Sequence, residues 1–388
     1  MFDTIHEMET PAFVIDEARC RESLAVAMKL ASDAGCHLLY ALKAQSNVDL
    51  VRVLREGVSG FAASSLFEAE LARSIAGIAG SVHITTPGFR AAEMSRLNEL
   101  CDFVALNSLS QLERFGSLLD DTSIGLRVNP ELSFVRDSRF DPCRKRSKLG
   151  IPLRDLAHVV DSEPEIFSGV EGLHFHSNCD ANDLRPLLKT VRRLTRSLDP
   201  LLRRLKWINL GGGYIFSPTT DGQPLRDAVG LLRDRYGVEV FVEPGASLAR
   251  PAGYLVSSVI DLGKRGKEHL AYLDTTVNHM PEVYEYQFEP DVIGDSPRGR
   301  YEYRLVGSTC LAGDVFGVYA FEEPLHVGSH VIFSNMGAYT SVKAHMFNGI
   351  NLPALYVRRA NGVLELRKQY TYRDFASLCG QEEADANL

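Results

Sequence analysis

The sequence predicts an α/β protein, a (β/α)₈ barrel of the TIM type followed by an antiparallel β domain. Three observations support this fold class. Eight short apolar runs alternate with stretches of helical periodicity, the pattern changes to short alternating runs after about residue 252, and 388 residues are more than a barrel of about 250 residues needs. An open doubly wound sheet is the alternative that the same periodicity permits.

The alternation is regular enough to assign each barrel strand. Intervening stretches such as NVDLVRVLRE and LRPLLKTVRRLTRSL place apolar residues on one helical face. A strand, a helix and a further strand in succession imply parallel pairing, and eight such units suit a closed barrel. The expected strands are HLLYALK (37–43), GFAAS (60–64), VHITT (82–86), FVALN (103–107), IGLRVN (124–129), VEGLHFH (170–176), LKWINL (205–210) and VEVFVEP (238–244).

The C-terminal third is predicted to form a separate antiparallel β domain. Its short runs, YLVSSVIDLGK, HLAYLDTT and SHVIFSN among them, are separated by Gly, Pro and charged clusters without long helices. The opening TPAFVIDEA is also strand-like, so the N-terminal segment is expected to pack with this domain. The predicted organisation is an N-terminal segment (1–30), a barrel (31–251) and a β domain (252–388).

Composition restricts the partners. Lys and Arg number 42 against 50 Asp and Glu, a net charge of -8, so the chain lacks the basic surplus that nucleic acid or an anionic membrane attracts. It has neither an apolar run of about 18 residues nor an N-terminal signal pattern. The seven cysteines include no CxxC pair, which argues against a disulfide framework or zinc site. We expect a cytoplasmic protein with reduced thiols that acts on a small molecule and holds no metal.

Reactive side chains recur at the ends of the predicted strands, where barrel enzymes place their active sites. Lys43 closes the first strand and could act as an amine nucleophile, although a lone lysine is more often a surface residue. Gly211, Gly212 and Gly213 follow the seventh strand. Their N–H groups could approach an anion such as phosphate, or the glycines could simply form a tight turn.

A carboxylate, two histidines and a cysteine are the other candidates. Glu243 closes the eighth strand and could hold a ring nitrogen protonated, or pair with an arginine such as Arg127. His174 and His176 alternate on opposite faces of the sixth strand, so we expect one to face the barrel mouth and the other to pack in the core. They lack the further ligands that a zinc site needs. Cys310 lies among glycines of the second domain, where an isolated cysteine is most often a small buried hydrophobic residue.

Together, a Schiff-base lysine, a phosphate loop, a carboxylate and a ring-facing histidine describe a pyridoxal 5′-phosphate site. The motifs around them resemble, over nearly the whole chain, the fold type III (alanine racemase-fold) decarboxylases, a family that includes ornithine, arginine and diaminopimelate enzymes. The carboxynorspermidine decarboxylases are the most similar, in DPC (141–143), SKLGI (147–151), HMP (279–281) and CLAGD (310–314). The family motifs are YALKA (40–44), LHFH (173–176), GGG (211–213), EPG (243–245), GSTC (307–310), GAYT (337–340) and FNG (347–349).

The resemblance implies a role for each matched cofactor residue. Lys43 would carry the cofactor as a Schiff base, His176 would stack on the pyridine ring, and Glu243 would pair with the pyridine nitrogen. A protonated ring is the electron sink for the carbanion left by CO₂, whereas racemases of this fold have an arginine at the position of Glu243, so the glutamate argues for decarboxylation. The glycines at 211–213 and Tyr339 would bind the phosphate.

The resemblance also implies a dimer and a substrate site. Cys310 would protonate the α-carbon after CO₂ loss and would come from the partner subunit, which implies a homodimer with shared active sites. Carboxylates in the second domain could bind a cationic substrate amine. The implied substrate-binding residues are Arg127, Ala246, His279, Glu282 and Asp314.

The predicted activity is decarboxylation of a polyamine-type amino acid, carboxynorspermidine or carboxyspermidine, to norspermidine or spermidine. Two residues depart from that subfamily's pattern, because Ala246 replaces a glutamate after EPG and Tyr214 replaces a histidine after GGG. The alternative is a same-fold decarboxylase for another amino acid, in specialised metabolism or of the diaminopimelate or ornithine type, although those two enzymes carry an acidic residue where Leu311 follows the cysteine. A non-catalytic pyridoxal-phosphate-binding protein is disfavoured by the second β domain.

Overall fold

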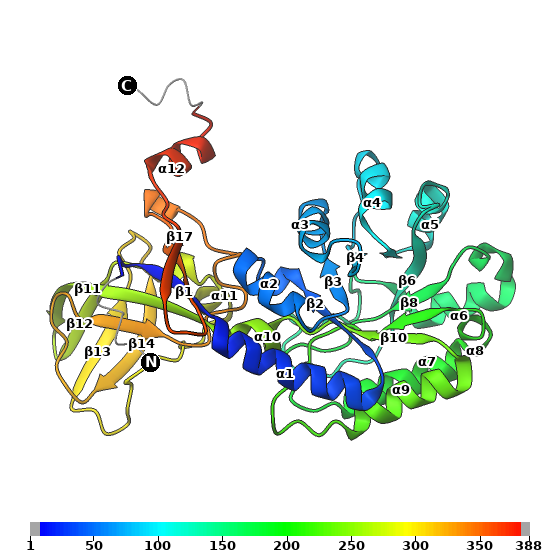
Figure 1. Cartoon of the computed structure of the whole chain (residues 1–388). Helices are drawn as coiled ribbons and strands as arrows, with labels where there is room; N and C mark the ends of the chain where they lie inside the picture. Colours follow the sequence, from blue (N-terminus) through cyan, green and yellow to red (C-terminus); the bar gives the residue numbers. More distant parts are fainter. Residues whose placement is uncertain (1–7, 382–388) are drawn as a thin grey trace. The chain divides into compact units, whose positions relative to one another are not determined.

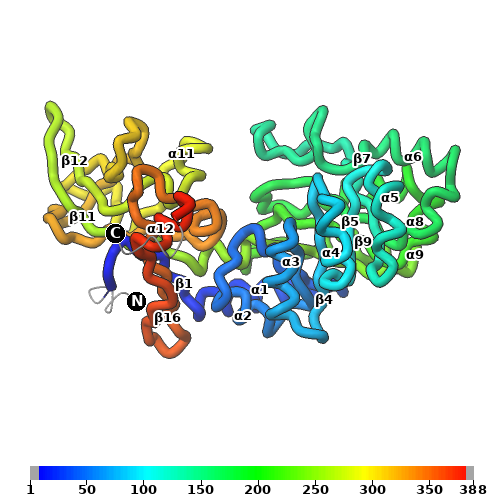
Figure 2. The backbone as a smooth tube through the Cα atoms, turned by 90° about the horizontal axis from the view of Figure 1, so that it is seen from above, coloured from blue at the N-terminus to red at the C-terminus, as the bar shows by residue number. Residues whose placement is uncertain are grey.

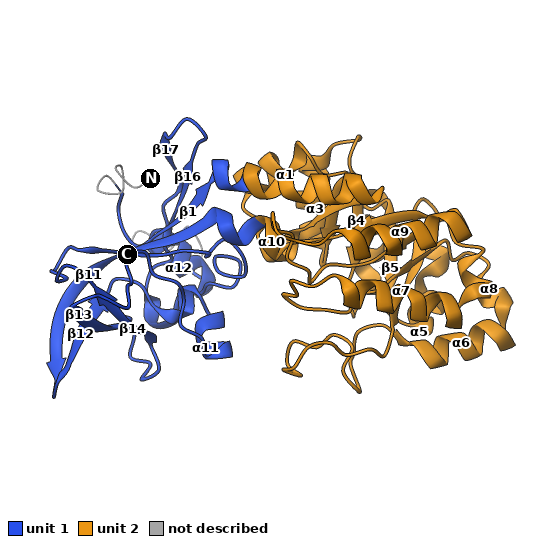
Figure 3. Ribbon diagram, turned by 90° about the horizontal axis from the view of Figure 1, so that it is seen from below, with its two compact units in different colours: residues 1–20, 249–388 blue, residues 21–248 orange. Residues whose placement is uncertain are grey.

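A computed structural model describes residues 8–381, which form two compact units (Figure 3). One unit comprises the chain up to Cys20 and from Ala249 onward, and the other is Arg21–Leu248. The sequence places these boundaries at 30/31 and 251/252, whereas the structure counts most of helix α1 (Glu17–Ala34) with the barrel. The N-terminal strand and the C-terminal third therefore belong to one unit although the whole barrel separates them along the chain.

The unit Arg21–Leu248 is a closed barrel of parallel strands (Figure 1). The sheet closes because β5 pairs with β4 on one side and with β6 on the other. All eight predicted strands are confirmed, and a two-residue strand, β7 (Ile151–Pro152), adds to the edge of β6 without having been predicted. The barrel strands are β2 (His37–Ala41), β3 (Gly60–Ala63), β4 (Ser81–Thr85), β5 (Phe103–Leu106), β6 (Ser123–Asn129), β8 (Gly172–His174), β9 (Trp207–Asn209) and β10 (Glu239–Val242).

Short capped turns connect strands to helices at the carboxyl end of the barrel. Ser65 Oγ accepts the N–H of Glu68 (3.3 Å) and Ser108 Oγ accepts the N–H of Gln111 (3.2 Å), so the helices after β3 and β5 each begin at a serine cap. These caps hold the strand ends, and with them the side chains that project there. The barrel helices are α2 (Val48–Arg55), α3 (Leu66–Ala76), α4 (Met94–Leu100), α5 (Leu109–Phe115), α6 (Leu153–Ser162), α7 (Arg185–Ser197), α8 (Asp199–Leu202), α9 (Gln223–Tyr236) and α10 (Ala246–Ala249).

The barrel interior is built around the only tryptophan of the chain, Trp207 on β9, which is 3 % exposed. A Cβ atom at Gly172 would lie 1.9 Å from the indole ring, and one at Gly125 would lie 2.5 Å from it. Both positions therefore require glycine, because any larger residue would clash with the indole ring in the close-packed barrel interior. The indole Nε1 donates to Ser123 Oγ (2.8 Å), which satisfies its buried N–H.

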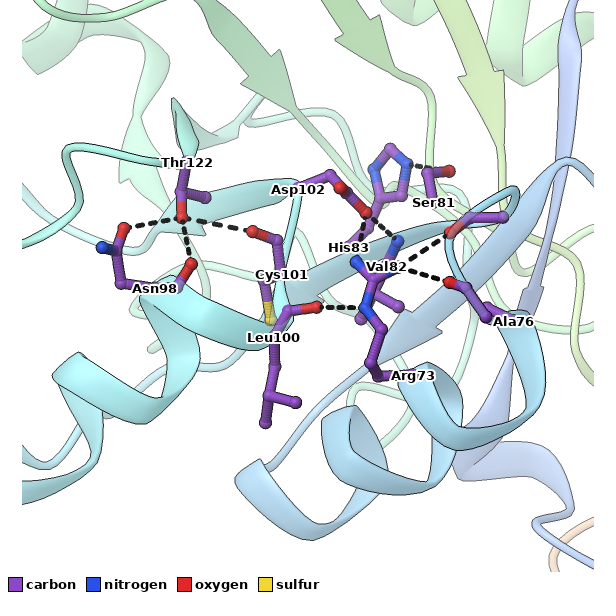
Figure 4. A network of polar contacts seen from close by, with 12 residues as sticks. Arg73, Ala76, Ser81, Val82, His83, Asn98, Leu100, Cys101, Asp102 and Thr122 are labelled. Carbon is purple, nitrogen blue, oxygen red and sulfur yellow. Dashed lines mark hydrogen bonds and ion pairs between the residues drawn. The ribbon is translucent and has the colours of Figure 1, made fainter.

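A polar network joins the amino ends of the barrel strands (Figure 4). Arg73 on α3 forms an ion pair with Asp102 (2.6 Å), and the same carboxylate accepts the N–H of Val82 at β4 (2.7 Å). Arg73 Nε also donates to the carbonyl of Leu100 (2.9 Å). These contacts lie at the end of the barrel opposite to the strand ends that carry catalytic groups in this fold, so we assign them to stability.

The second unit confirms the predicted β domain, although its mostly antiparallel sheet also contains two parallel pairs. Strand β1 pairs with β11 antiparallel and with β16 parallel, side by side in Figure 2, and β12 pairs with β13 parallel. The pairing of β1 confirms that the N-terminal segment joins this domain. The parallel pair β12–β13 is possible because a long connection, which includes helix α11 (Glu282–Tyr286), separates the two strands in the chain.

Helix α11, strand β14 and helix α12 of this unit were not predicted. Strand β14 directly follows the loop that carries Cys310, and helix α12 (Tyr372–Leu378) begins at a capping box formed by Thr371 and Asp374. None of the helices between residues 8 and 381 is long and apolar enough to cross a lipid bilayer. The strands of the unit are β1 (Ala12–Asp16), β11 (Gly253–Arg265), β12 (Glu268–Leu273), β13 (Tyr301–Val306), β14 (Val315–Phe321), β15 (His330–Phe333), β16 (Ala354–Arg358) and β17 (Leu364–Lys368).

Candidate active site

A pocket with an empty volume of about 300 Å³ opens at the carboxyl ends of six barrel strands. The predicted residues Lys43, Arg127, His176 and Glu243 all line it. Small and hydroxylic residues at the ends of β3 and β4 also line it, although the sequence analysis did not single them out from the runs GFAAS and VHITT. The complete lining is Ala41, Lys43, Ala62, Ala63, Ser64, Thr85, Arg127, His174, His176 and Glu243.

Lys43 is held at the pocket by its neighbours. It is the middle residue of a single 3₁₀ turn, Leu42–Ala44, in which Leu42 and Ala44 are buried and Lys43 is exposed. The N–H of Ala41 donates to the carbonyl of Pro244 (3.3 Å), which connects the end of β2 to the segment that carries Glu243. Lys43 is therefore a pocket residue with a fixed backbone rather than a lysine on the outer surface.

Glu243 is a buried, ionised carboxylate. It is 6 % exposed, and its two oxygens accept separate hydrogen bonds, Oε1 from His174 Nε2 (3.1 Å) and Oε2 from Asn209 Nδ2 (3.1 Å). Burial alone would raise its pKa, but the imidazoles of His174 and His176 and the ammonium of Lys43 hold the pKa of Glu243 well below its ordinary value. Among the described residues, its hydrogen-bond partners are thus His174 and Asn209 rather than Arg127, and His176 Nδ1 lies 3.9 Å from its Oε1.

Both predicted histidines line the pocket, so the expectation that they lie on opposite faces is wrong, although His174 is also buried at 1 % exposed. Residues two positions apart in a strand lie on the same face, so alternation does not separate His174 from His176. Nδ1 of His174 is buried and has no hydrogen-bond partner among the described residues. A proton there would be an unsatisfied buried donor, so His174 is neutral and donates its Nε2–H to Glu243. Burial lowers the pKa of His174 accordingly.

The backbone sets the tautomer of His176. Its Nδ1 accepts the N–H of Gly212 (3.2 Å), so the ring proton lies on Nε2. Burial lowers the pKa of His176 to about 4. The ring is therefore neutral at physiological pH.

Barrel stability is expected to fall as the pH drops from about 6.5 towards 4. Burial lowers the pKa of His83, an interior residue stacked on Phe103, to about 3, and that of His176 to about 4. The unfolded chain protonates these groups near 6.5 while the native barrel does not, so each costs up to about 1.4 kcal/mol of unfolding free energy per pH unit below 6.5. Urea unfolding followed by Trp207 fluorescence at pH 7, 6 and 5 measures this slope. His83→Asn should flatten the slope, whereas His158→Asn, on the exposed surface of α6, should leave it unchanged.

The triple-glycine turn combines the two interpretations that the sequence left open. A Cβ atom at Gly213 would lie 2.0 Å from the carbonyl oxygen of Asn178, and Gly213 has a φ of +83°, so the turn itself requires glycine. The N–H of Gly211 donates to Asn209 Oδ1 (2.8 Å) and that of Gly212 to His176. Of the three, Gly213 alone has an N–H without a partner among the described residues, and it is the donor that the turn can offer to a phosphate.

The predicted residues of the β domain have different environments within their own unit. Cys310 is exposed, so it is not the small buried residue that an isolated cysteine usually is. His279 is fully buried, its Nδ1 lies 2.9 Å from Thr275 Oγ1, and its Nε2 has no hydrogen-bond partner between residues 8 and 381. Burial lowers the pKa of His279 to about 3. Tyr339 has a φ of +58°, a left-handed conformation that bulky residues rarely adopt.

The two carboxylates predicted to bind a substrate amine differ sharply. Glu282 is the first residue of α11 and lies 3.6 Å from the ammonium of Lys343, so a cation already faces it. Asp314 is 4 % exposed, and both of its oxygens accept hydrogen bonds from the surrounding loops. This arrangement does not support a direct contact of Asp314 with a substrate. Ala246 is half-buried at the start of α10.

Comparison with known proteins gives consistent matches. Residues 21–250 match the family model of the pyridoxal binding domain of pyridoxal-dependent decarboxylases. The chain is 33 % identical to carboxyaminopropylagmatine decarboxylase of Synechocystis, over 97 % of each protein. It is 31 % identical to carboxynorspermidine/carboxyspermidine decarboxylase of Campylobacter jejuni, over 95 % of this chain and 98 % of that one. The crystal structure of carboxynorspermidine decarboxylase from C. jejuni complexed with norspermidine superposes with a TM-score of 0.87 at 29 % identity, covering 96 % of this chain and all of that one.

Proposed function

This chain belongs to the family of pyridoxal-dependent decarboxylases, and we propose that it decarboxylates carboxynorspermidine or carboxyspermidine to norspermidine or spermidine. In this reaction the bond from the α-carbon to the carboxylate breaks, CO₂ leaves, and one proton is added to the α-carbon. The observation that carries the proposal is the buried, ionised Glu243 at the mouth of a barrel that matches the family over its whole length.

The pocket fits pyridoxal phosphate by its donor set. A pyridine nitrogen that carries a proton needs an anionic acceptor, and Glu243 is held ionised by two hydrogen bonds. A carbonyl group needs an amine, and Lys43 supplies one at the same pocket. A phosphate needs unpaired N–H donors, and Gly213 has one. When bound, pyridoxal phosphate supplies an electron sink for the pair left on the α-carbon as CO₂ departs.

Each remaining pocket residue has a part in this proposal. His176 is neutral and fixed by Gly212, so its flat face can cover a protonated ring without repelling it. Arg127 is a buried cation, and the guanidinium can orient an anionic oxygen at the pocket. Burial lowers the pKa of Arg127. The ordinary pKa of a guanidinium is so high that Arg127 stays charged.

We extend the proposal to assembly and location. The acid that protonates the α-carbon would be Cys310, presented by the partner subunit of a homodimer with shared active sites, because its thiol is exposed and the barrel pocket contains no cysteine. Tyr339 of the β domain would bind the phosphate. A cytoplasmic location is part of the same proposal, supported by the seven free thiols.

One further candidate substrate has specific support. The Synechocystis relative is named for carboxyaminopropylagmatine, which carries a guanidine in place of a terminal amine, and it is 33 % identical to this chain. The sequence motifs alone do not point to this compound. Ala246, which replaces a glutamate expected near a substrate amine, favours a pocket whose distal end is arranged differently from that of carboxynorspermidine decarboxylases.

The substrate proposal predicts a steep preference in CO₂ release. With the pyridoxal-phosphate-loaded protein, carboxynorspermidine and carboxyspermidine should be turned over at least about 10²-fold faster than diaminopimelate, ornithine, lysine or arginine, because unmatched buried polar groups discriminate strongly. Carboxyaminopropylagmatine belongs in the same panel. A clear preference for it would move the assignment to the second candidate, and a preference for diaminopimelate or ornithine would overturn both.

Ala246→Glu tests the residue that departs from the subfamily. If the missing carboxylate separates this protein from its relatives, the variant should lower the KM for carboxynorspermidine by about tenfold with little change in kcat, since an added ion pair acts on binding. Ala246→Gln is the matched control of similar size without the charge. An unchanged KM in both variants would show that another group contacts the distal amine.

A further inference from the structure

The exposed thiol of Cys310 makes no hydrogen bond to the residues that the structure describes, but its backbone is held from two sides. Cys310 lies in the loop between β13 and β14, and its N–H donates to Asn348 Oδ1 (3.0 Å). The preceding residue, Thr309, donates both its N–H (3.0 Å) and its hydroxyl (2.5 Å) to Asp314 Oδ2. Two acceptors therefore determine where this exposed loop presents its sulfur.

Asp314 also reaches the segment that leads to His279 and Glu282. Its second oxygen, Oδ1, accepts the N–H of Val277 (2.8 Å), the first residue of a 3₁₀ turn that ends at His279. One carboxylate thus joins the cysteine loop to the segment 277–282, in which the sequence analysis placed substrate contacts. The adjacent Ser308 N–H donates to the carbonyl of Thr275 (3.2 Å), a second connection between the same two segments.

Neighbouring residues leave space for the carboxylate of Asp314 and for the contact between Asn348 and Cys310. Asp314 is 4 % exposed, and a Cβ atom at Gly307 would lie 2.2 Å from its Oδ1, so glycine leaves the space that the carboxylate occupies. Asn348 has a φ of +57°, a conformation that Asn adopts more readily than most residues, and this conformation accompanies the contact of its side chain with the Cys310 N–H. Buried and bonded through both oxygens, Asp314 has the environment of an anchor rather than of a substrate ligand.

We infer that Asp314 and Asn348 are positioning residues that place the Cys310 thiol for proton delivery. The inference rests on the proposed function, in which Cys310 supplies the proton to the α-carbon. Correct delivery gives the amine and CO₂. If the proton is added instead to the cofactor's aldehyde carbon, one water would cleave the bond between the α-carbon and the nitrogen and supply the aldehyde oxygen. The α-carbon would then leave as an aldehyde, oxidised at the expense of the cofactor, which would leave as pyridoxamine phosphate; one CO₂ is released and one proton consumed in either outcome. A misplaced thiol therefore changes the ratio of products, which a general loss of stability does not.

The matched pair of variants at residue 348 isolates the contact. Asn348→Asp keeps an acceptor for the Cys310 N–H, and Asn348→Gly tolerates the left-handed backbone but has no acceptor. We expect Asn348→Asp to keep the product ratio of the wild type. We expect Asn348→Gly and Asp314→Asn to raise the aldehyde fraction at least about tenfold and to lower kcat by up to about 10²-fold, the cost of a displaced catalytic group. Asp295→Asn, which removes an exposed carboxylate elsewhere in the unit, is the control.

A second measurement does not depend on the substrate. The rate of Cys310 alkylation by iodoacetamide, followed by peptide mass spectrometry, should change severalfold in Asn348→Gly and stay at the wild-type value in Asn348→Asp, while the exposed Cys379 serves as the internal reference. If Cys310→Ala leaves the product ratio of the wild type unchanged, the proposed role of the thiol fails. If Cys310→Ala shifts the ratio but Asn348→Gly shifts neither the ratio nor the alkylation rate, the positioning inference fails and the proposed function stands. If Asp314→Asn does not fold, the comparison of Asn348→Asp with Asn348→Gly still tests the positioning inference.

Discussion

Lys43→Ala is expected to abolish the visible absorbance of the pyridoxal-phosphate-loaded protein and to reduce turnover by on the order of 10³-fold or more. The lysine amine at this pocket is the group that would bind the cofactor covalently, and Lys43 is the only lysine in the pocket lining. Without it the cofactor would be held by the proposed non-covalent contacts alone. An absorbance spectrum taken after dialysis, together with CO₂ release, measures both effects.

The control for this variant is Lys29→Ala. Lys29 is an exposed lysine of α1 that pairs with Asp33 at 2.8 Å, and surface pairs of this kind contribute little. Its absorbance and turnover should equal those of the wild type. A Lys43→Ala protein that folds normally and keeps the visible band would refute the assignment of Lys43, whatever its activity.

Glu243→Gln is expected to lower kcat by about 10² to 10³-fold while the cofactor stays bound. The carboxylate accepts one hydrogen bond on each oxygen, from His174 and from Asn209. An amide keeps one acceptor but turns an N–H₂ group towards one of these donors, and it removes the charge that a protonated ring nitrogen requires. The absorbance of the bound cofactor should therefore persist, with a shifted maximum, while the release of CO₂ becomes slow.

Glu239→Gln provides the comparison on the same strand. Glu239 is the exposed first residue of β10, at the amino end of the strand that leads to Glu243. Neutralising it changes the net charge of the protein by the same amount without touching the pocket, so kcat should not change. Equal kcat values in Glu243→Gln and the wild type would mean that this carboxylate is not the partner of the ring nitrogen.

The barrel was predictable from the sequence because each strand end carries a local signal. Apolar runs between amphipathic helices locate all eight strands, and the reactive residues follow from their place at the ends of those strands. Lys43 and Glu243 were found in this way, whereas Arg127 was named as a possible partner of Glu243 and as a substrate contact implied by the resemblance. The inference failed at His174 and His176, because residues two positions apart in a strand share a face and both side chains therefore reach the pocket.

What the sequence could not show depends on contacts between distant segments. The parallel pairing of β1 with β16 joins residues more than 300 positions apart, and no local pattern distinguishes it from an antiparallel pair. The role of Asp314 is of the same kind. Its carboxylate suggested an amine ligand, whereas its burial and its bond to the N–H of Val277 become visible only in three dimensions.

Asn209 shows how the protein avoids an ambiguity at its active site. A side-chain amide beside a carboxylate has two orientations related by a flip, and only one of them offers an N–H₂ group. Here the N–H of Gly211 occupies the amide oxygen, so the nitrogen is turned towards Glu243 before any cofactor arrives. The N–H of Gly211 thus fixes Asn209, and Asn209 in turn orients the carboxylate of Glu243. Because the amide does not have to rotate when charge develops on the cofactor, no reorganisation energy is spent on that rotation.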